Sequence, residues 1–204
     1  MCSSDLSLAT IEFGEETSKA VAIYNDKKNI QVFDVFLDKI LYKQLGKAIK
    51  NSHDKDLVKL VGMDIDFYNV MSILRGKFWN IDEEQIKDLI VSHTSSVPRD
   101  LLGKMISSDS VRGVMDELAS SRYRDLIPQT ENELDAVSAL EHNSEMAIFR
   151  AVNRYFTKMF KFSTIVGITK LTSYEVRNIA AIAFAVEQKI DPQTTMSRLI
   201  IEQE

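Results

Sequence analysis

The chain is poor in the residues on which tight turns, disulfides and thiolate metal sites depend. Its 204 residues include 7 Gly, 3 Pro and 1 Cys, and the cysteine stands at position 2. So few turn-forming residues argue against a sandwich or barrel of many short strands and favour long helices. A single cysteine excludes an internal disulfide and a cysteine-based zinc site, and it is typical of a reducing, intracellular compartment.

The sequence also lacks an excess of positive charge and any long apolar run. Lys and Arg total 25 against 30 Asp and Glu, a net charge of −5, which argues against a general nucleic-acid binder. The most apolar stretch, residues 179–186, is far shorter than the roughly 20 residues of a membrane span. The start, MCSSDL, has no basic segment of a signal peptide. We therefore expect contact with a membrane only through partner proteins.

Apolar residues recur at three- and four-residue spacing through most of the chain, and no stretch alternates as a strand would. This pattern predicts an all-α fold. Gly167 is expected to break a long helix. Asp82 and the run Ser107-Ser108-Asp109-Ser110 are expected to cap short ones. The predicted helices cover residues 31 to about 50, about 56–78, 82 to about 92, two short segments within 93–127, 131 to about 162, and two segments after Gly167 that separate near Pro192.

Two segments resemble each other at an offset of 109 residues. DFYNVMSI begins at Asp66 and EVRNIAAI begins at Glu175, and in both copies an aspartate follows that opens a shorter helix. The offset predicts two similar helical subdomains, 31–128 and 129–204, after an N-terminal segment, 1–30. The matched positions are Asp66, Asn69 and Ile73 in the first copy and Glu175, Asn178 and Ile182 in the second. We expect both isoleucines to be core residues.

The repeated acid–asparagine pair is interpreted as structural. Asp66 and Asn69 share one face of an apolar helix, and buried carboxylates and amides must be hydrogen-bonded, so they are expected to tie one helix to the next. His53, His93 and His142 are scattered and lack the spacing of metal ligands. The glycines form no phosphate-binding loop. We therefore expect no catalytic residues, no metal site, no cofactor and no tight nucleotide binding.

The stretch Asp66 to Lys77, Asp-x-x-Asn-x-x-x-Ile-Leu-Arg-Gly-Lys, resembles the repeated signature of the C subunit of archaeal-type ATP synthases, a family that includes the d subunit of vacuolar ATPases. FLDKILY, residues 36–42, is similar to the family's preceding helix, and YEVRNI, residues 174–179, to its last repeat. Family members have three such subdomains and this chain has two. Segment 1–30 is interpreted as the tail of a missing first repeat. The second copy also lacks Arg-Gly-Lys. With two subdomains in place of three, the chain is interpreted as a divergent short member or a fragment, and a complete three-fold funnel is not expected.

The resemblance implies a non-catalytic central-stalk subunit. Such a subunit is a funnel of helices that sits on the membrane rotor ring and receives the foot of the central shaft. It transmits torque between ATP chemistry in one sector and ion flow in the other. The implied partners are the shaft subunits and the ring, and the implied location is the cytoplasmic face of the membrane, as a peripheral part of the complex. No nucleic acid and no cofactor are implied.

Charge is segregated along the predicted helix at 131–162. Residues 129–149 contain acids and no Lys or Arg, whereas residues 150–170 contain bases and no Asp or Glu. The bases fall on one stripe: Arg150, Arg154, Lys158 and Lys161. One interpretation is a solvated helix whose charge order complements its dipole. The other is a docking stripe for an acidic partner surface, with Arg75 and Lys77 as further candidates.

The basic stripe at residues 150–161 also suggests an alternative to the stalk subunit. A stand-alone helical adaptor could bind an acidic protein or a nucleic acid through these bases. Aromatic residues alternate with the bases in this region, but at helical spacing such residues are more typical of a core than of base-stacking platforms. Rotary-ATPase subunits encoded beside this chain would distinguish the stalk subunit from the adaptor.

Overall fold

The computed structural model describes residues 17–18, 21–22, 24–25, 28, 31–50, 52–92, 95–155 and 161–202. These residues form helices and connections without a strand, which confirms the all-α prediction. Most of segment 1–30 lies outside the described residues, and so does its interpretation as a repeat tail. The elements are α2 (Gln31–Ile49), α3 (Lys55–Phe78), α4 (Glu83–Leu89), α5 (Arg99–Ile106), α6 (Val111–Leu118), the 3-10 turn η1 (Arg124–Leu126), α7 (Glu133–Tyr155), α8 (Phe162–Glu187) and α9 (Pro192–Met196).

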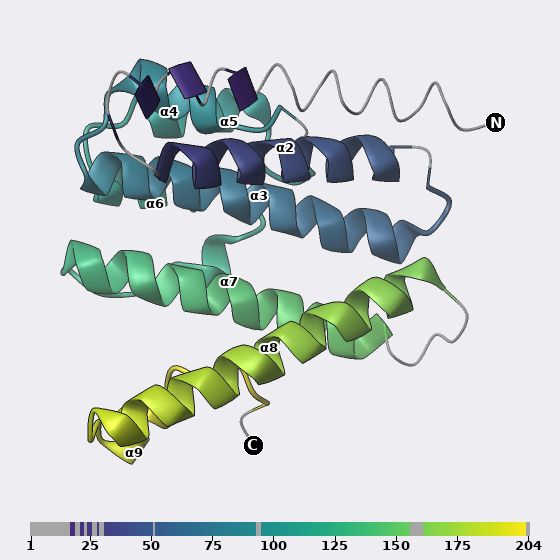
Figure 1. Ribbon diagram of the computed structural model, residues 1–204. Helices are drawn as coiled ribbons and strands as arrows, with labels where there is room; N and C mark the ends of the chain where they lie inside the picture. The colour runs from purple at the N-terminus through teal and green to yellow at the C-terminus, as the bar shows by residue number, and fades with distance from the viewer. Residues whose placement is uncertain are drawn as a thin grey trace.

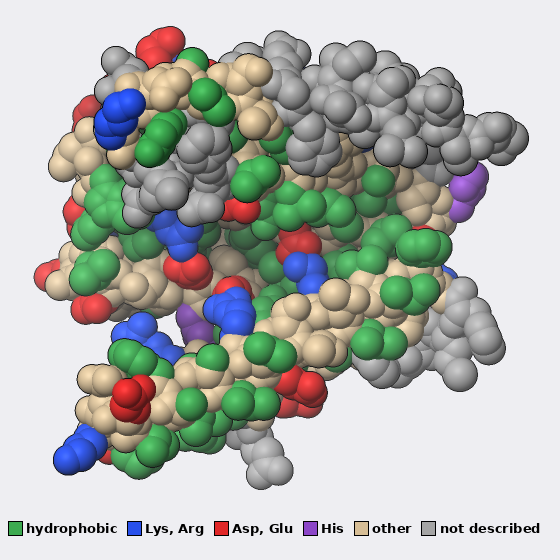
Figure 2. Space-filling view, in the orientation of Figure 1, with side chains coloured by type: hydrophobic (Ala, Val, Ile, Leu, Met, Phe, Trp, Pro, Cys, Tyr) green, Lys and Arg blue, Asp and Glu red, His purple; other side chains and the backbone are tan. Residues whose placement is uncertain are grey.

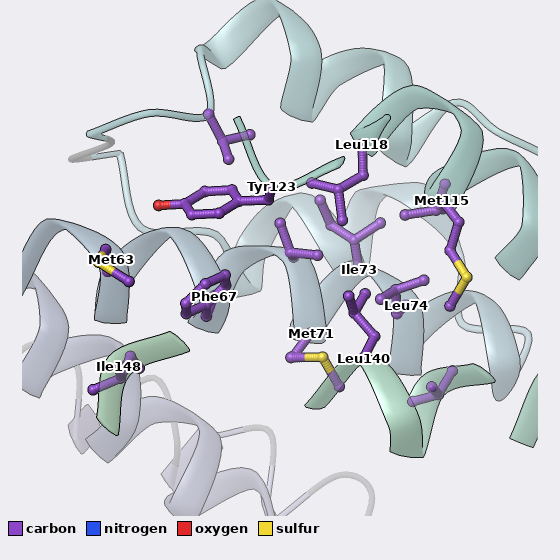
Figure 3. Close-up of a cluster of buried hydrophobic side chains, with 14 of the residues drawn as sticks. Met63, Phe67, Met71, Ile73, Leu74, Met115, Leu118, Tyr123, Leu140 and Ile148 are labelled. Carbon is purple, nitrogen blue, oxygen red and sulfur yellow. The ribbon is translucent and has the colours of Figure 1, made fainter. Parts of the chain in front are cut away.

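Helix α3 is the central element of the fold. It packs against α2, α4, α5, α6, α7 and α8. Figure 1 shows α2 and α7 on different sides of α3, and α8 crossing α7. A helix surrounded in this way must be apolar around most of its circumference, and the central part of α3 is buried almost without interruption. Its side chains join those of α5, α6, α7 and α8 in one continuous core. Figure 3 shows members of this core from α3, α6 and α7.

The helix starts follow local chemistry that the sequence displays. The Asp82 carboxylate accepts a hydrogen bond from the Gln85 N–H, and the Ser110 hydroxyl accepts one from the Gly113 N–H, as predicted. Asp54 caps α3 in the same way and also accepts the N–H of Ser163 at 2.9 Å, near the start of α8. One carboxylate therefore links the beginnings of two helices that are far apart in the sequence.

The predicted helix break at Gly167 is wrong. Gly167 lies inside α8, where it is buried against α7. A Cβ atom at this position would lie 3.0 Å from Cγ1 of Val152, closer than a side chain can sit without displacing its neighbour. The close approach of α7 and α8 explains the glycine, and tertiary packing outweighs the low helix propensity of glycine, which costs about 1 kcal/mol relative to alanine.

In both copies of the repeat an asparagine side chain makes two hydrogen bonds to the backbone of one distant residue, an arrangement called here the asparagine clasp. The Asn69 amide donates to the Val91 carbonyl at 3.0 Å and accepts from the Val91 N–H at 2.8 Å. The Asn178 amide makes the same two bonds with Ile200, at 2.9 and 3.0 Å. Each asparagine thus ties its long helix to the chain that follows the next short helix. The division into subdomains at residue 128 stays a prediction, because one core extends across that boundary.

The two repeated isoleucines differ in burial. Ile73 of α3 is fully buried, as predicted. Ile182 of α8 is 43 % exposed, so the prediction that it is a core residue is wrong. The difference comes from the neighbouring helices. Helices α5 and α6 pack on α3, whereas the neighbours of α8, which are α3, α7 and α9, leave the side that carries Ile182 partly exposed.

Replacing each isoleucine with alanine should separate the two copies energetically. Ile73→Ala removes three methyl or methylene carbons from a closed core and should lower the free energy of unfolding by about 2–5 kcal/mol. Ile182→Ala is the matched control at the equivalent position and should change it by less than about 1 kcal/mol because its side chain is partly solvated. Denaturant unfolding measures both values. Equal losses would contradict the difference in burial.

Candidate functional site

A groove of about 800 Å³ lies between α2, α3 and α4 on one side and α7 and α8 on the other. Figure 2 shows Lys, Arg, Asp and Glu side chains gathered in the hollow above α8. Aromatic side chains form much of the remaining wall. They are Phe36, Tyr42, Phe67, Tyr68, Trp79 and Tyr174. The groove therefore combines an aromatic, largely apolar wall with charges of both signs.

Three ion pairs in the groove connect the helices that form it. Arg75 of α3 pairs with Glu141 of α7 at 2.7 Å between Nη2 and Oε1. Arg177 of α8 forms two bonds with Glu145 of α7, one of them 3.0 Å between Nη2 and Oε2. The third pair, Lys170 with Asp64, joins α8 to α3.

Two of these pairs place the acidic half of the charge-segregated helix at the groove. Its two groove-facing carboxylates, Glu141 and Glu145, are four residues apart and so share one face of α7. Their bases come from α3 and α8, far away in the sequence. Sequence reasoning missed the groove because each pair joins segments whose proximity no local pattern reveals. The one available signal was the pair of acids at helical spacing without a base nearby.

Asp64 is the most buried charge in the groove, with a side chain that is 9 % exposed. Both of its oxygens lie within 3 Å of the Lys170 ammonium, at 2.8 and 2.9 Å. Burial raises the pKa of the Asp64 carboxyl above its ordinary value, and the attraction of Lys170 opposes that shift. The ion pair is therefore partly desolvated and depends on both partners.

The tyrosines of the groove are held neutral. The rings of Tyr42 and Tyr68 lie 4.5 Å apart between centroids. Burial raises the pKa of each phenol to about 12, so both stay protonated near pH 7. Tyr68 uses its hydroxyl as a donor to the Leu89 carbonyl at 3.1 Å. Such groups suit apolar contact and hydrogen bonding to a bound surface more than proton transfer.

The buried carboxylate of the repeat signature does not belong to the groove. Asp66 accepts the N–H groups of Ser95 and Ser96 at 2.9 and 2.8 Å, and the hydroxyl of Tyr123 at 2.8 Å. These bonds hold the chain before α5 and the chain after α6 onto α3. Its counterpart, Glu175, is exposed on α8.

The structure separates the predicted partner-binding residues. Arg150 and Arg154 are exposed near the end of α7, and Lys158 lies outside the described residues. Lys161 is 3.1 Å from a carboxylate oxygen of Asp56. The remaining two candidates differ: Arg75 lies in the groove, whereas the Lys77 side chain is 10 % exposed and its ammonium is 4.0 Å from Glu83.

Two kinds of functional feature are missing from the residues that the structure describes. None of their helices combines the length and the apolar composition that crossing a bilayer requires. Their His, Cys, Asp and Glu side chains form no group of three that could hold a metal ion.

Comparisons with known proteins agree on one family. The sequence model of the ATP synthase (C/AC39) subunit matches residues 6–198. The A-type ATP synthase C subunit of Pyrococcus horikoshii is 29 % identical over 177 residues, which are 81 % of this chain and 46 % of that protein. The corresponding proteins of Methanosphaera stadtmanae and Methanocaldococcus jannaschii are 24 % and 23 % identical and cover 90 % and 93 % of this chain, in each case with 49 % of their own length. The chain thus spans about half the length of these relatives. No solved structure gives a significant match.

Removing the base of the buried ion pair should destabilise the fold in a pH-dependent way. In Lys170→Met the Asp64 carboxylate loses its partner, which should cost about 3 kcal/mol at pH 8. The folded-state pKa of Asp64 is raised, so its contribution to stability is largest at low pH and falls as the pH rises through that pKa. The loss should therefore shrink as the pH falls from 8 toward 4, because protonation removes the uncompensated buried charge.

Denaturant unfolding of the wild type and Lys170→Met at both pH values measures this effect. The double variant Asp64→Asn, Lys170→Met is the control, because it has no charge at either position and should show no such pH dependence. A loss in Lys170→Met that is equal at pH 4 and pH 8 would contradict the ionised, buried Asp64.

Proposed function

Because the chain belongs to the ATP synthase (C/AC39) subunit family, we propose that it is a non-catalytic central-stalk subunit of an A-type or V-type rotary ATPase. In this role it links the central shaft to the membrane rotor ring and transmits torque for ion transport coupled to ATP. The observation that carries the proposal is the family match over nearly the whole chain. The relatives named as C subunits of A-type ATP synthases support it.

The groove is the proposed seat of the shaft. A stalk subunit of this kind must grip another protein without catalysing a reaction, and wide aromatic surfaces with few free charges are suited to that task. Ion pairs from α3 and α8 to α7, and from α8 to α3, brace the groove against shear between its helices. Torque applied to the groove would then pass to the whole protein and not to one helix alone.

Arg150 and Arg154 are proposed as a second contact. Both are exposed on the last turns of α7, where they can meet an acidic face of the shaft or of a neighbouring protein of the complex. Complementary charge at such a site sets orientation and encounter rate more than affinity. The protein would lie at the cytoplasmic face of the membrane as a peripheral subunit, held there by the ring and the shaft.

Filling the groove should prevent capture of the shaft. Ser173 is an exposed residue of α8 that lines the groove, so Ser173→Trp should occupy the seat without disturbing the core. Thr172→Trp is the control: Thr172 is also exposed on α8, but it lies about 100° around the helix from Ser173 and does not line the groove. A pull-down of A-type ATP synthase shaft subunits should fail with Ser173→Trp and succeed with Thr172→Trp. Equal capture by both would reject the groove as the seat.

Reversing the second contact should give a salt-dependent effect. Exposed ion pairs are each worth about 0–1 kcal/mol, so the double variant Arg150→Glu, Arg154→Glu is needed to produce a clear loss of capture. The loss should be greater at low salt than at high salt because counterions screen exposed charges. The control, Arg112→Glu, reverses an exposed base of α6. If the double variant captures the shaft subunits as the wild type does at every salt concentration, these arginines are solvent-exposed residues that do not contact the shaft.

A further inference from the structure

Three lysines at the connection between α2 and α3 carry charges that the fold itself does not use. Lys50, Lys55 and Lys59 are exposed, and none of them forms an ion pair or a side-chain hydrogen bond with another residue that the structure describes. Lys50 directly follows α2. Lys55 and Lys59 are four residues apart on α3, so they share one face of that helix. The three ammonium groups are therefore accessible to a ligand outside the fold.

Helix stability does not account for the base at the start of α3. Lys55 is the first residue of the helix, where the helix dipole favours an acid over a base. The acids of this connection are instead occupied within the fold. Asp54 caps α3 and accepts the Ser163 N–H, and Asp56 pairs with Lys161 at 3.1 Å. The three lysines thus remain a local positive charge on a chain whose net charge is −5.

The same end of the molecule carries an exposed aromatic residue. The contacts of Asp54 with Ser163 and of Asp56 with Lys161 place the start of α8 beside the start of α3. Figure 1 shows the connection from α2 to α3 and the start of α8 at one end of the molecule. Phe162, the first residue of α8, is 69 % exposed. Bases beside an exposed aromatic ring are typical of segments that lie on a bilayer, where the ring enters the interface and the bases contact the headgroups.

We propose that this end of the molecule, called here the basic end and defined by Lys50, Lys55, Lys59 and Phe162, binds the surface of a bilayer that contains anionic lipids. Its composition favours lipid over an acidic protein, because protein interfaces are enriched in arginine and depleted in lysine. Lysine suits a fluid layer of phosphate headgroups, since its ammonium is a point charge that needs no fixed geometry. The direct contact would add to the membrane contact through partner proteins, and it does not depend on the stalk assignment.

Co-sedimentation of the full chain with lipid vesicles tests the proposal. At low salt the chain should bind vesicles that contain phosphatidylglycerol and should not bind vesicles of phosphatidylcholine alone. Each lysine near an anionic surface strengthens binding by about fivefold, so the triple variant Lys50→Gln, Lys55→Gln, Lys59→Gln should bind about 100-fold more weakly. Binding of the wild type should also weaken as the salt concentration rises, because counterions screen the headgroup charge.

Two further variants separate the basic end from charge in general. The triple variant Lys104→Gln, Arg112→Gln, Arg124→Gln is the matched control, because it removes the same charge from exposed bases of α5, α6 and η1. It should bind the vesicles as the wild type does. Phe162→Ser should weaken binding by several fold at every salt concentration, since burial of the ring in the interface does not depend on ionic screening.

Several results would overturn the proposal. They are an absence of binding to phosphatidylglycerol vesicles at low salt, equal binding to phosphatidylcholine alone, and equal losses in the two triple variants. A lysine triple variant that loses capture of the shaft subunits, in a chain that binds no vesicle, would make an acidic protein the occupant of the basic end. The shaft pull-down uses no lipid, so failure of the lipid contact would leave the proposed stalk function standing.

Discussion

The requirement that buried polar groups be satisfied organises this molecule around α3. Asp64, Asp66 and Asn69 lie within six residues of one another in the central part of α3, which is mostly apolar and enclosed. Each needs partners that the helix itself cannot supply, and leaving a buried donor or acceptor unpaired costs about 1–3 kcal/mol, more for a charge. Lys170 of α8, the backbone around Ser95 and the backbone of Val91 meet these needs. Three polar residues thereby determine where three separate parts of the chain must lie.

The groove follows from the same requirement. The Lys170–Asp64 pair draws α8 against α3, and Glu141 and Glu145 of α7 pair with bases from both of those helices. The charges in this part of the groove are therefore largely used within the fold. What remains for a partner is the aromatic wall and the outward surfaces of the paired groups. A surface of this composition favours broad contact with another protein.

Helix α8 has two sides that differ in what they contact. Its polar side closes the groove, and its apolar side repeats the pattern of α3 without the cover that α3 receives. The local conformation of the second copy is nevertheless the same as that of the first, down to the asparagine clasp, the aspartate cap and the turn with positive φ. Local structure in this repeat is thus independent of whether its apolar face is covered, because the clasp, the cap and the turn are all made within the repeat itself.

The sequence by itself determined the helical class, most helix boundaries, the capping residues and the repeat, because these depend on side chains within about one or two helical turns of each other. Helical periodicity also identified Ile73 as a core residue. It could not distinguish Ile73 from Ile182, since the same pattern occurs in both and only the presence of α5 and α6 on one helix separates them. In the same way, Gly167 is typical of a break until α7 is seen beside it, and Arg75 resembles a free base until Glu141 meets it. Those features were decided by tertiary structure, because each depends on a contact between residues that no local interaction brings together.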